Sequence, residues 1–502
     1  MTDTAKPPAR ADETLFARAG RALGWSFAST AVSKLSTLVI GVVLARLLGP
    51  HAFGTFAVAT VALLALLSFN ELGVSLAIVR WPDDPREMVP TVATISVAAS
   101  ALMCALCYVA APAFSAAMGD PSATPVVRVL GLSVLVSGLS AGPVALLQRE
   151  FRQDRKMIGD QVGSWTSALV SIGCAVGGMG AMSLAVGQLL GSAVSAVLFA
   201  AFAPAGLRFG YNAAKARALL KFGLPLAGSS IVVFAVSHTD KLVVGAVLGP
   251  VPLGFYVLAA NVANWPNSMF SLPVRSVAPA LLARLQRNRT VMRSAFLSFG
   301  GLLAAITVPA CVVLAAGSGP LVDLVYGEVW HASAAVLAWL ALVTVMRVLF
   351  ELLYDYFVVL ANTRVVFAVQ VLWFAALMPA LYFGARSGGP AGAAAAQLVV
   401  VVLVIAPVYL FELRRTGVSP WAFLGRLAPA FGAGVAVAAV GGLAAVFIGS
   451  DLVALLVCGV AGAAALGLLL YRMRGAVRSL RGLRADDEAE PDDVTLVAAA
   501  PA

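Results

Sequence analysis

Long apolar runs follow one another along nearly the whole chain, and short polar stretches separate them. A run of about 20 apolar residues crosses the roughly 30 Å hydrocarbon layer of a membrane as a helix, which satisfies its own backbone polar groups in lipid. The pattern therefore predicts an all-α integral membrane protein with about fourteen transmembrane helices. The predicted spans are 22–45, 53–78, 89–111, 124–147, 160–180, 182–204, 222–247, 252–274, 294–317, 333–357, 365–385, 390–411, 426–448 and 452–471.

One turn occurs twice in the sequence. The stretch LARLLGPHAFGTFAVA at 44–59 returns as VGAVLGPVPLGFYVLA at 244–259, with Leu, Gly, Pro, Gly and Ala at matching positions. The first copy joins the first two predicted spans and the second joins the seventh and eighth, so the repeating unit is six spans. An even unit predicts two six-helix lobes of the same orientation, related by a pseudo-two-fold axis along the membrane normal, with a substrate site between them.

These patterns divide the chain into six segments. They are an N-terminal segment 1–21, an N-terminal lobe 22–204, a linker 205–221, a C-terminal lobe 222–411, two additional helices 426–471 and a tail 472–502. The tail is acidic after Arg484 and contains proline, a composition typical of disorder.

Composition and charge agree with a membrane protein. The chain has 61% hydrophobic and 12% charged residues, whereas soluble domains carry about 25% charged residues. Lys and Arg are retained on the cytoplasmic side, and placing the N-terminus there leaves Arg46 and Arg386 as the basic residues outside. We therefore expect a multi-pass protein of the cytoplasmic membrane with both termini in the cytoplasm. The net charge of +10 then reflects topology and does not indicate a nucleic-acid partner.

The sequence contains no pattern that predicts catalysis. It has no Walker motif, no paired carboxylates in a soluble loop, no metal-ligand cluster and no glycine-rich nucleotide loop. The five cysteines fall inside predicted spans and are expected to be buried hydrophobes. The outer connections are short, the longest being 315–333. We therefore expect neither an enzyme nor a metal or cofactor site.

Four stretches resemble, in order, the Wzx-type oligosaccharide flippases of the multidrug/oligosaccharidyl-lipid/polysaccharide exporter superfamily, and in particular their WzxC-like branch. The stretches are ARLLGPHAFGTFAVATVALLALLSFNELGVSLAIVR, ALLQREFRQDRKMIGDQVGSWTSALVSIG, FGLPLAGSSIVVFAVSHTDKLVVGAVLGPVPLGFYVLA and YGEVWHASAAVLAWLAL. The resemblance implies two six-helix lobes around a central cavity, two further C-terminal helices, and transfer of undecaprenyl-pyrophosphate-linked oligosaccharide repeat units between leaflets by alternating access. A polysaccharide polymerase, glycosyltransferases, membrane lipids and a coupling cation are the partners expected for such a role.

Cations inside the predicted spans are the candidates for binding a pyrophosphate. Ionisable side chains in a membrane usually face a bundle interior or a water-filled cavity. The candidates are Lys34, Lys241, Arg275 and Arg347. Lys34 lies about 18 Å from the inner end of its span and Arg347 about 20 Å from the outer end, so both are expected near the midplane. Their charge would lower the cost of moving an anion through a low-dielectric passage. Each could instead pair with a carboxylate, Lys34 with Glu71 and Arg347 with Glu351.

The other ionisable residues in the spans are candidates for coupling or gating. They are Glu71, His238, Asp240, Glu351 and Asp355. Asp240 and Lys241 are adjacent on one helix and so point about 100° apart. Arg347, Glu351 and Asp355 form an i, i+4, i+8 stripe, which could be a cytoplasmic gate or a salt-bridged strip facing other helices. His238 could relay protons or make an interhelical hydrogen bond.

Two other functions fit the same pattern. A cation-coupled multidrug exporter of the same fold would also use intramembrane acids, and Glu71 and Asp240 could serve it. A membrane-bound polysaccharide polymerase or glycosyltransferase would act on the same lipid, but such enzymes usually need acidic residues in a sizeable loop. The excess of cations in the core favours an anionic substrate, and the short loops argue against the enzyme.

Overall fold

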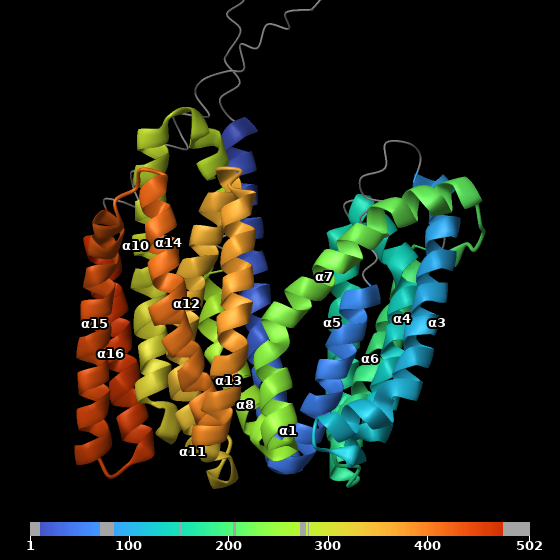
Figure 1. Ribbon diagram of the computed structural model, residues 1–502, viewed down its shortest axis with the longest axis horizontal. Coiled ribbons are helices and arrows are strands. Elements are labelled where there is room, and N and C mark those ends of the chain that lie inside the picture. Colours follow the sequence, from blue (N-terminus) through green and yellow to red (C-terminus); the bar gives the residue numbers. More distant parts are fainter. Residues whose placement is uncertain are drawn as a thin grey trace, which may run out of the picture. The chain divides into compact units, whose positions relative to one another are not determined.

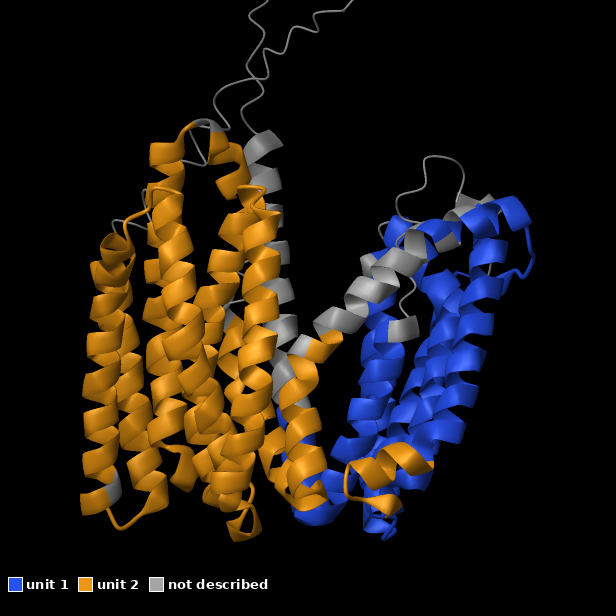
Figure 2. Ribbon diagram, in the orientation of Figure 1, with its two compact units in different colours: residues 1–111, 122–228 blue, residues 112–121, 229–502 orange. Residues whose placement is uncertain are grey.

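The computed structural model describes residues 11–70, 85–150, 152–203, 207–271, 278–279 and 281–474, without the side chains of 11–37, 69–70, 85–87, 153, 218, 220, 222–233, 236, 270–271, 287 and 445. Every regular element in this part of the chain is a helix (Figure 1). The chain divides into two compact units, residues 1–111 with 122–228 and residues 112–121 with 229–502 (Figure 2).

Unit 1 is a bundle of long helices. They are α1 (Ala11–Asn70), α3 (Pro85–Ala117) up to residue 111, α4 (Thr124–Arg149), α5 (Gln153–Val176), α6 (Ala181–Phe202) and the first part of α7 (Ala213–Leu248). Helix α6 packs along α5 and α4, and α4 packs on α1. Met88, Leu147, Phe199 and Leu219 belong to one buried apolar cluster, which holds α3, α4, α6 and the start of α7 together.

Unit 2 is also a helical bundle, built around α10. Its helices are the rest of α7, α8 (Pro250–Ala263), α10 (Arg289–Ala316), α11 (Ser318–Val325), α12 (Ala332–Val359), α13 (Thr363–Val400), the π-helical η6 (Val401–Ile405), α14 (Ala406–Arg415), α15 (Pro420–Phe447) and α16 (Asp451–Arg472). Helix α10 packs on α12, α15 and α16. At the core, the Phe296 ring stacks on Phe423 with their centroids 5.5 Å apart and lies 4.3 Å from the Tyr356 ring.

Nine helical segments in the described residues are long and apolar enough to cross a membrane. One of them, Thr363–Arg415, contains two predicted spans, because the chain turns at Gly388 and Gly389, where φ of Gly389 is 60°. The two arms touch at their backbones, since a Cβ on Gly392 would lie 2.2 Å from the Gly384 carbonyl oxygen. The predicted all-α membrane architecture is confirmed, and fourteen crossings remain a prediction.

The repeated sequence is also a repeat of local structure. Gly49 has φ 71° and ψ 174°, and Gly249 has φ 85° and ψ −172°. Side chains with a Cβ almost never adopt this region of backbone conformation, so glycine is required at both turns. Pro50 and Pro250 follow, and Pro250 opens α8, where its fixed φ suits the first helical turn. The tight turns predicted at both positions are confirmed.

Several helix boundaries differ from the predicted spans, among them the start of α7 and the end of α8. Helix α7 begins at Ala213, earlier than residue 222, because the Asn212 side-chain oxygen accepts from the backbone N–H groups of Ala214 at 3.0 Å and Lys215 at 3.2 Å. Helix α8 ends at Ala263, whereas the predicted span continued to residue 274. The π-helical turn η3 (Asn267–Ser271) follows it. Pro266 lies at this break and lacks the N–H that a continuous α-helix needs.

The connection at 315–333 is folded. It contains α11 and the 3-10 turn η5 (Glu328–Trp330), and the Trp330 side chain is buried against Phe255 with ring centroids 5.9 Å apart. The His331 Nδ1 atom lies 2.9 Å from the Asp323 carboxylate. A short connection can therefore cap the bundle without extending away from it.

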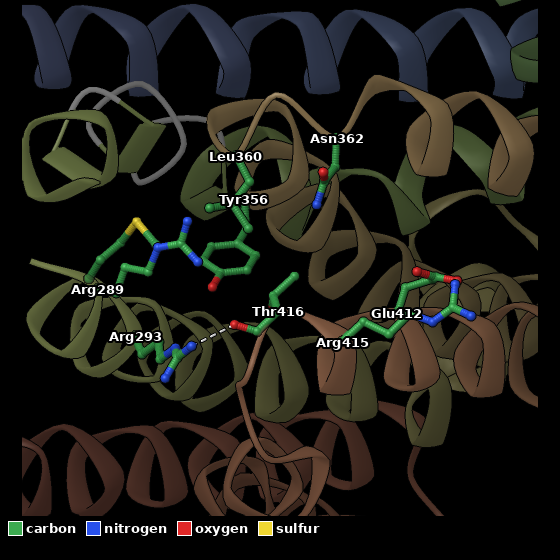
Figure 3. Close-up of a pocket in the computed structure, with 9 residues that line it drawn as sticks. Arg289, Arg293, Tyr356, Leu360, Asn362, Glu412, Arg415 and Thr416 are labelled. Carbon is green, nitrogen blue, oxygen red and sulfur yellow. Dashed lines mark hydrogen bonds and ion pairs between the residues drawn. The ribbon is translucent and has the colours of Figure 1, made fainter. Parts of the chain in front are cut away.

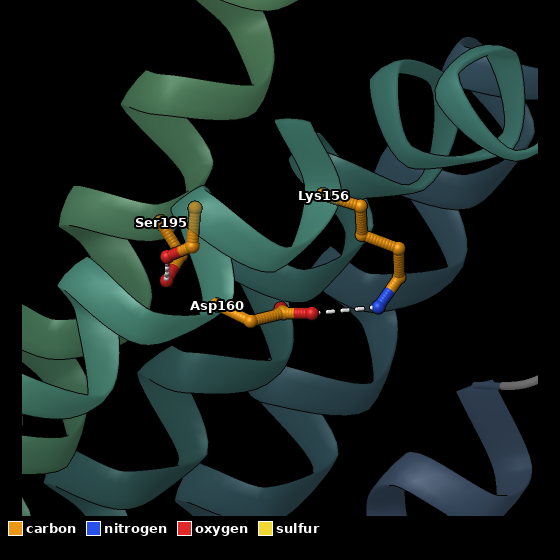
Figure 4. A network of polar contacts seen from close by, with 4 residues as sticks. Lys156, Asp160 and Ser195 are labelled. Atoms are coloured by element: carbon orange, nitrogen blue, oxygen red, sulfur yellow. Dashed lines mark hydrogen bonds and ion pairs between the residues drawn. The ribbon is translucent and has the colours of Figure 1, made fainter. Parts of the chain in front are cut away.

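Small residues allow α5 and α6 to approach closely. Gly159, Gly163, Ser167 and Ser171 recur every four residues on α5, so they share one face of that helix. A Cβ on Gly191 of α6 would lie 2.5 Å from the Gly163 carbonyl oxygen. The Ser195 hydroxyl donates to the Gly159 carbonyl at 3.0 Å, close to the 2.7 Å Lys156–Asp160 ion pair (Figure 4). In lipid, such close backbone packing is a main source of helix association.

We expect Gly191→Leu to separate α5 from α6 and to lower the free energy of unfolding by about 1–3 kcal/mol, because the added side chain has no room. The measurement is the thermal midpoint of the purified chain, together with its abundance in membranes. Gly173→Leu on α5 is the matched control, since a Cβ there meets nothing within 4 Å. An equal loss of stability in both variants would mean that the change in helix propensity, and not the contact between α5 and α6, causes the loss.

Candidate functional site

A chain of hydrogen bonds crosses three helices of unit 2. The Tyr256 hydroxyl, on α8, donates to Asp240 Oδ2, on α7, at 3.0 Å. The Gln397 side chain, on α13, donates to the same Tyr256 oxygen. Tyr256 is fully buried, and a buried hydroxyl without partners would cost about 1–3 kcal/mol, so this chain fixes the positions of the three side chains.

Asp240 makes a second contact on its own helix. Its Oδ1 accepts from the backbone N–H of Lys241 at 2.8 Å, while its Oδ2 faces Tyr256. Both carboxylate oxygens are thus engaged, and Lys241 follows on the next position around α7. That the Asp240 and Lys241 side chains point about 100° apart stays a prediction.

His238 lies one turn from Lys241 in the same part of unit 2. Its ring meets the Phe234 ring edge-on, with centroids 4.8 Å apart. Its Nδ1 atom is buried and has no hydrogen-bond partner in the described residues. Lys241 and Arg347 lie close enough to act on the His238 ring electrostatically. The hydrogen bond that the sequence suggested for this histidine is therefore not present at Nδ1.

Arg347 and Glu351 form an ion pair on α12. Arg347 Nε lies 3.8 Å from Glu351 Oε1, and their side chains are 50% and 24% exposed. An arginine has five N–H donors, so this long contact leaves most of its fork available. Asp355, one further turn along, is 9% exposed. The three residues of the predicted stripe thus change from half-exposed to buried along the helix.

Six of the predicted candidates are described residues of unit 2, namely His238, Asp240, Lys241, Arg347, Glu351 and Asp355. The side chains of Lys34, Glu71 and Arg275 lie outside the described residues. The roles of all nine candidates stay predictions. The described residues contain no group of three or more His, Cys, Asp or Glu that could hold a metal ion.

The sequence search missed Tyr256 and Gln397, because it considered ionisable side chains alone. A signal for Tyr256 was present in the repeat, where Tyr256 stands at the position of Phe56 in the first copy. These two aromatic side chains differ by the hydroxyl group of Tyr256, which makes the hydrogen bonds to Asp240 and Gln397. No comparable signal marks Gln397.

Comparison with known protein families gives a match to the family described as "Polysaccharide biosynthesis protein", over residues 43–335. The chain is 25% identical over 411 residues to the lipopolysaccharide biosynthesis protein WzxC of Escherichia coli (strain K12), covering 79% of this chain and 83% of that protein. It is 26% identical over 330 residues to the succinoglycan biosynthesis transport protein ExoT of Rhizobium meliloti (strain 1021), covering 64% and 65% of the two chains.

Solved structures share the fold. The inward closed conformation of the lipid II flippase MurJ superposes with a TM-score of 0.72 at 13% identity, covering 89% of this chain and 99% of that one. The inward-facing conformation of a multidrug resistance MATE family transporter gives a TM-score of 0.60 at 18% identity, covering 77% and 94%. At these identities the likeness shows the architecture alone, which is all-α.

Proposed function

Because this chain belongs to the polysaccharide biosynthesis protein family, we propose that it is a flippase that moves undecaprenyl-pyrophosphate-linked oligosaccharide repeat units across the cytoplasmic membrane for cell-surface polysaccharide synthesis. The observation that carries the proposal is the family match over more than half of the chain, in a fold shared with transporters. Two relatives named for the biosynthesis or transport of surface polysaccharides support it.

The polar cluster of unit 2, which consists of Asp240, Tyr256 and Arg347, suits an anionic headgroup. A pyrophosphate must lose much of its hydration in a low-dielectric passage, and nearby fixed cations offset that cost. Arg347 is half exposed and has N–H donors left for a bidentate contact, and Lys241 on α7 adds a point charge in the same unit. Lys34 and Arg275 are proposed as further contacts of the same substrate.

Movement of the substrate is proposed to follow alternating access of two six-helix lobes, with fourteen crossings and both termini in the cytoplasm. Asp240, His238 and Glu71 are proposed coupling groups, and Glu351 and Asp355 belong to the proposed gate on α12. The Asp240–Tyr256–Gln397 chain supports this role, because it stabilises a buried region in which the charge of the Asp240 carboxylate can respond to protonation or cation binding.

A cation-coupled multidrug exporter is the second candidate. The observation that favours it is Asp240, an intramembrane carboxylate held by a hydrogen-bond chain in a fold shared with a multidrug transporter. The two functions differ in the charge of the substrate, so the cations Lys241 and Arg347 favour the first.

The direct experiment uses the purified full chain in proteoliposomes that contain the lipid-linked oligosaccharide in one leaflet. We expect the sugar to become accessible to a membrane-impermeant glycosidase on the other side, without added ATP. Protein-free liposomes give the background rate. Failure of monodisperse protein to transfer the lipid, with efflux of cationic drugs instead, would favour the exporter, and incorporation of labelled sugar would favour an enzyme.

The proposed topology predicts a labelling pattern. A cysteine replacing Val329, which is 70% exposed in the connection between α10 and α12, should react with an impermeant thiol reagent added outside intact cells. A cysteine replacing Arg152, whose side chain is 44% exposed in the connection between α4 and α5, should react after the cells are opened. The parent chain with its five cysteines gives the background. The opposite pattern would reverse the orientation and the direction of transport.

A further inference from the structure

A cavity of about 210 Å³ lies within unit 2 where α10 begins, where α12 meets α13 and where α14 ends (Figure 3). It is lined by Arg289, Met292, Arg293, Tyr356, Leu360, Asn362, Glu412, Arg415 and Thr416. None of these residues belongs to the polar cluster of Asp240, Tyr256 and Arg347. The volume is below the roughly 300–1,000 Å³ of sites for drug-sized ligands, so this cavity suits a small group.

The lining has more positive than negative charge. It contains three arginines and one carboxylate, and that carboxylate, Glu412, pairs with Arg415 at 3.0 Å. Neither Arg289 nor Arg293 pairs with a carboxylate in the part of the chain that the structure describes. Two guanidinium groups therefore remain without a counter-charge at one small cavity, and such a cavity favours an anion.

The position of Arg293 is fixed by the end of α14. Its Nη2 donates to the Thr416 carbonyl at 2.7 Å, and its Nε is buried without a partner in the described residues. Gly417, with φ +82°, makes room for this group, because a Cβ there would lie 2.2 Å from Arg293 Nη2. The guanidinium is thus held through its Nη2 donor, while its Nε donor has no partner in the described residues.

Tyr356 supplies a second unsatisfied donor. The residue is fully buried between aromatic neighbours, its ring centroid 4.3 Å from that of Phe296, and its hydroxyl has no partner in the described residues. In Figure 3 the hydroxyl is on the side of the ring that faces Arg293 and Thr416. Buried hydroxyls in native proteins almost always have a partner, so an unpartnered one at a cationic cavity indicates a missing acceptor.

We propose that this cavity binds a phosphate group, carried either by an anionic lipid headgroup or by a soluble phosphate. A phosphate presents acceptor oxygens, and the unengaged groups are the donors of Arg289, Arg293 and Tyr356, with the Asn362 amide beside them. Arginine forks match phosphate oxygens in pairs, and a charge-assisted hydrogen bond is about twice as strong as a neutral one. None of the lining residues is a proposed saccharide contact, so the proposal does not depend on the proposed function.

The test uses the purified full chain and two probes, inorganic phosphate in detergent and nanodiscs of phosphatidylcholine with or without phosphatidylglycerol. Bound lipid is counted by native mass spectrometry, and the affinity for phosphate is measured by the shift of the thermal midpoint. We expect at least one probe to bind the parent. We expect Arg289→Gln with Arg293→Gln to weaken that binding about tenfold or more, because two charged contacts are lost.

Tyr356→Phe keeps the packing of the ring and removes the hydroxyl, so it should fold normally and weaken binding by about threefold to tenfold. Arg414→Gln is the matched control, because Arg414 lies in the same last turn of α14 but outside the lining. Binding of phosphatidylglycerol alone identifies a lipid headgroup site, and binding of inorganic phosphate identifies a soluble ligand. The proposal is overturned if neither probe binds the parent, if Arg414→Gln weakens binding as much as the double variant, or if Tyr356→Phe leaves it unchanged.

Discussion

Arg347→Ala is expected to lower transfer of the lipid-linked saccharide at least about tenfold while the protein stays near its normal abundance. The single contact of Arg347 to Glu351 is long, at 3.8 Å, and half of its side chain is exposed, so its loss should cost little stability. The loss of the proposed contact between this charge and the substrate should cost far more in transport. The measurement is initial transfer rate in proteoliposomes, normalised to folded protein. Arg347→Lys should recover part of the rate, because it restores the charge without the bidentate fork.

A different role for Arg347 predicts a different result. If Arg347 does no more than hold Glu351, the single variant leaves that carboxylate without its partner on α12, and Arg347→Ala with Glu351→Ala should recover both abundance and transfer. Recovery in the double variant would contradict substrate contact. Arg386→Ala is the matched control, since Arg386 lies 4.6 Å over the Tyr382 ring, away from the cluster, and its loss should leave transfer unchanged.

The sequence was sufficient for those features that follow from strong local physics. Apolar length predicts helices in lipid, and a glycine followed by proline at matched positions predicts turns, so Gly49 and Gly249 adopt the same backbone conformation. The early end of α8 was also readable in principle, because Pro266 cannot continue a helix without losing a hydrogen bond.

The candidate site could be predicted in part, because a sequence shows which residues in a membrane span are charged but not which residues they contact. Searching for ionisable residues found Asp240 and Arg347. It could not show that Asp240 is held by an uncharged tyrosine on α8 and a glutamine on α13, since these contacts join positions far apart in sequence. The cavity in unit 2 could not be predicted for the same reason, because Arg289, Tyr356 and Thr416 come from separate helix ends.

Asp240→Asn is expected to reduce transfer about tenfold or more, with abundance and thermal midpoint close to those of the parent, if the charge of Asp240 takes part in coupling. Asparagine keeps the shape and one acceptor oxygen, so the contact to Tyr256 can persist. The charge beside Lys241 and the acceptor for the Lys241 N–H are removed, and the lost hydrogen bond should cost only about 1 kcal/mol. Transfer rate and thermal midpoint are measured on the same preparation, which separates a loss of function from a loss of folded protein.

Tyr256→Phe tests the structural side of the same contact. It keeps the charge of Asp240 but leaves one carboxylate oxygen and the Gln397 amide without their shared partner in a buried region, so we expect the free energy of unfolding to fall by about 1–3 kcal/mol. Transfer per folded molecule should then stay within about twofold of the parent, because the charge remains. Asp240→Asn should therefore lower mainly the transfer rate, and Tyr256→Phe should lower mainly the free energy of unfolding. If Asp240→Asn loses stability and keeps its rate, Asp240 is a structural anchor of α7 and α8, and coupling must use another group.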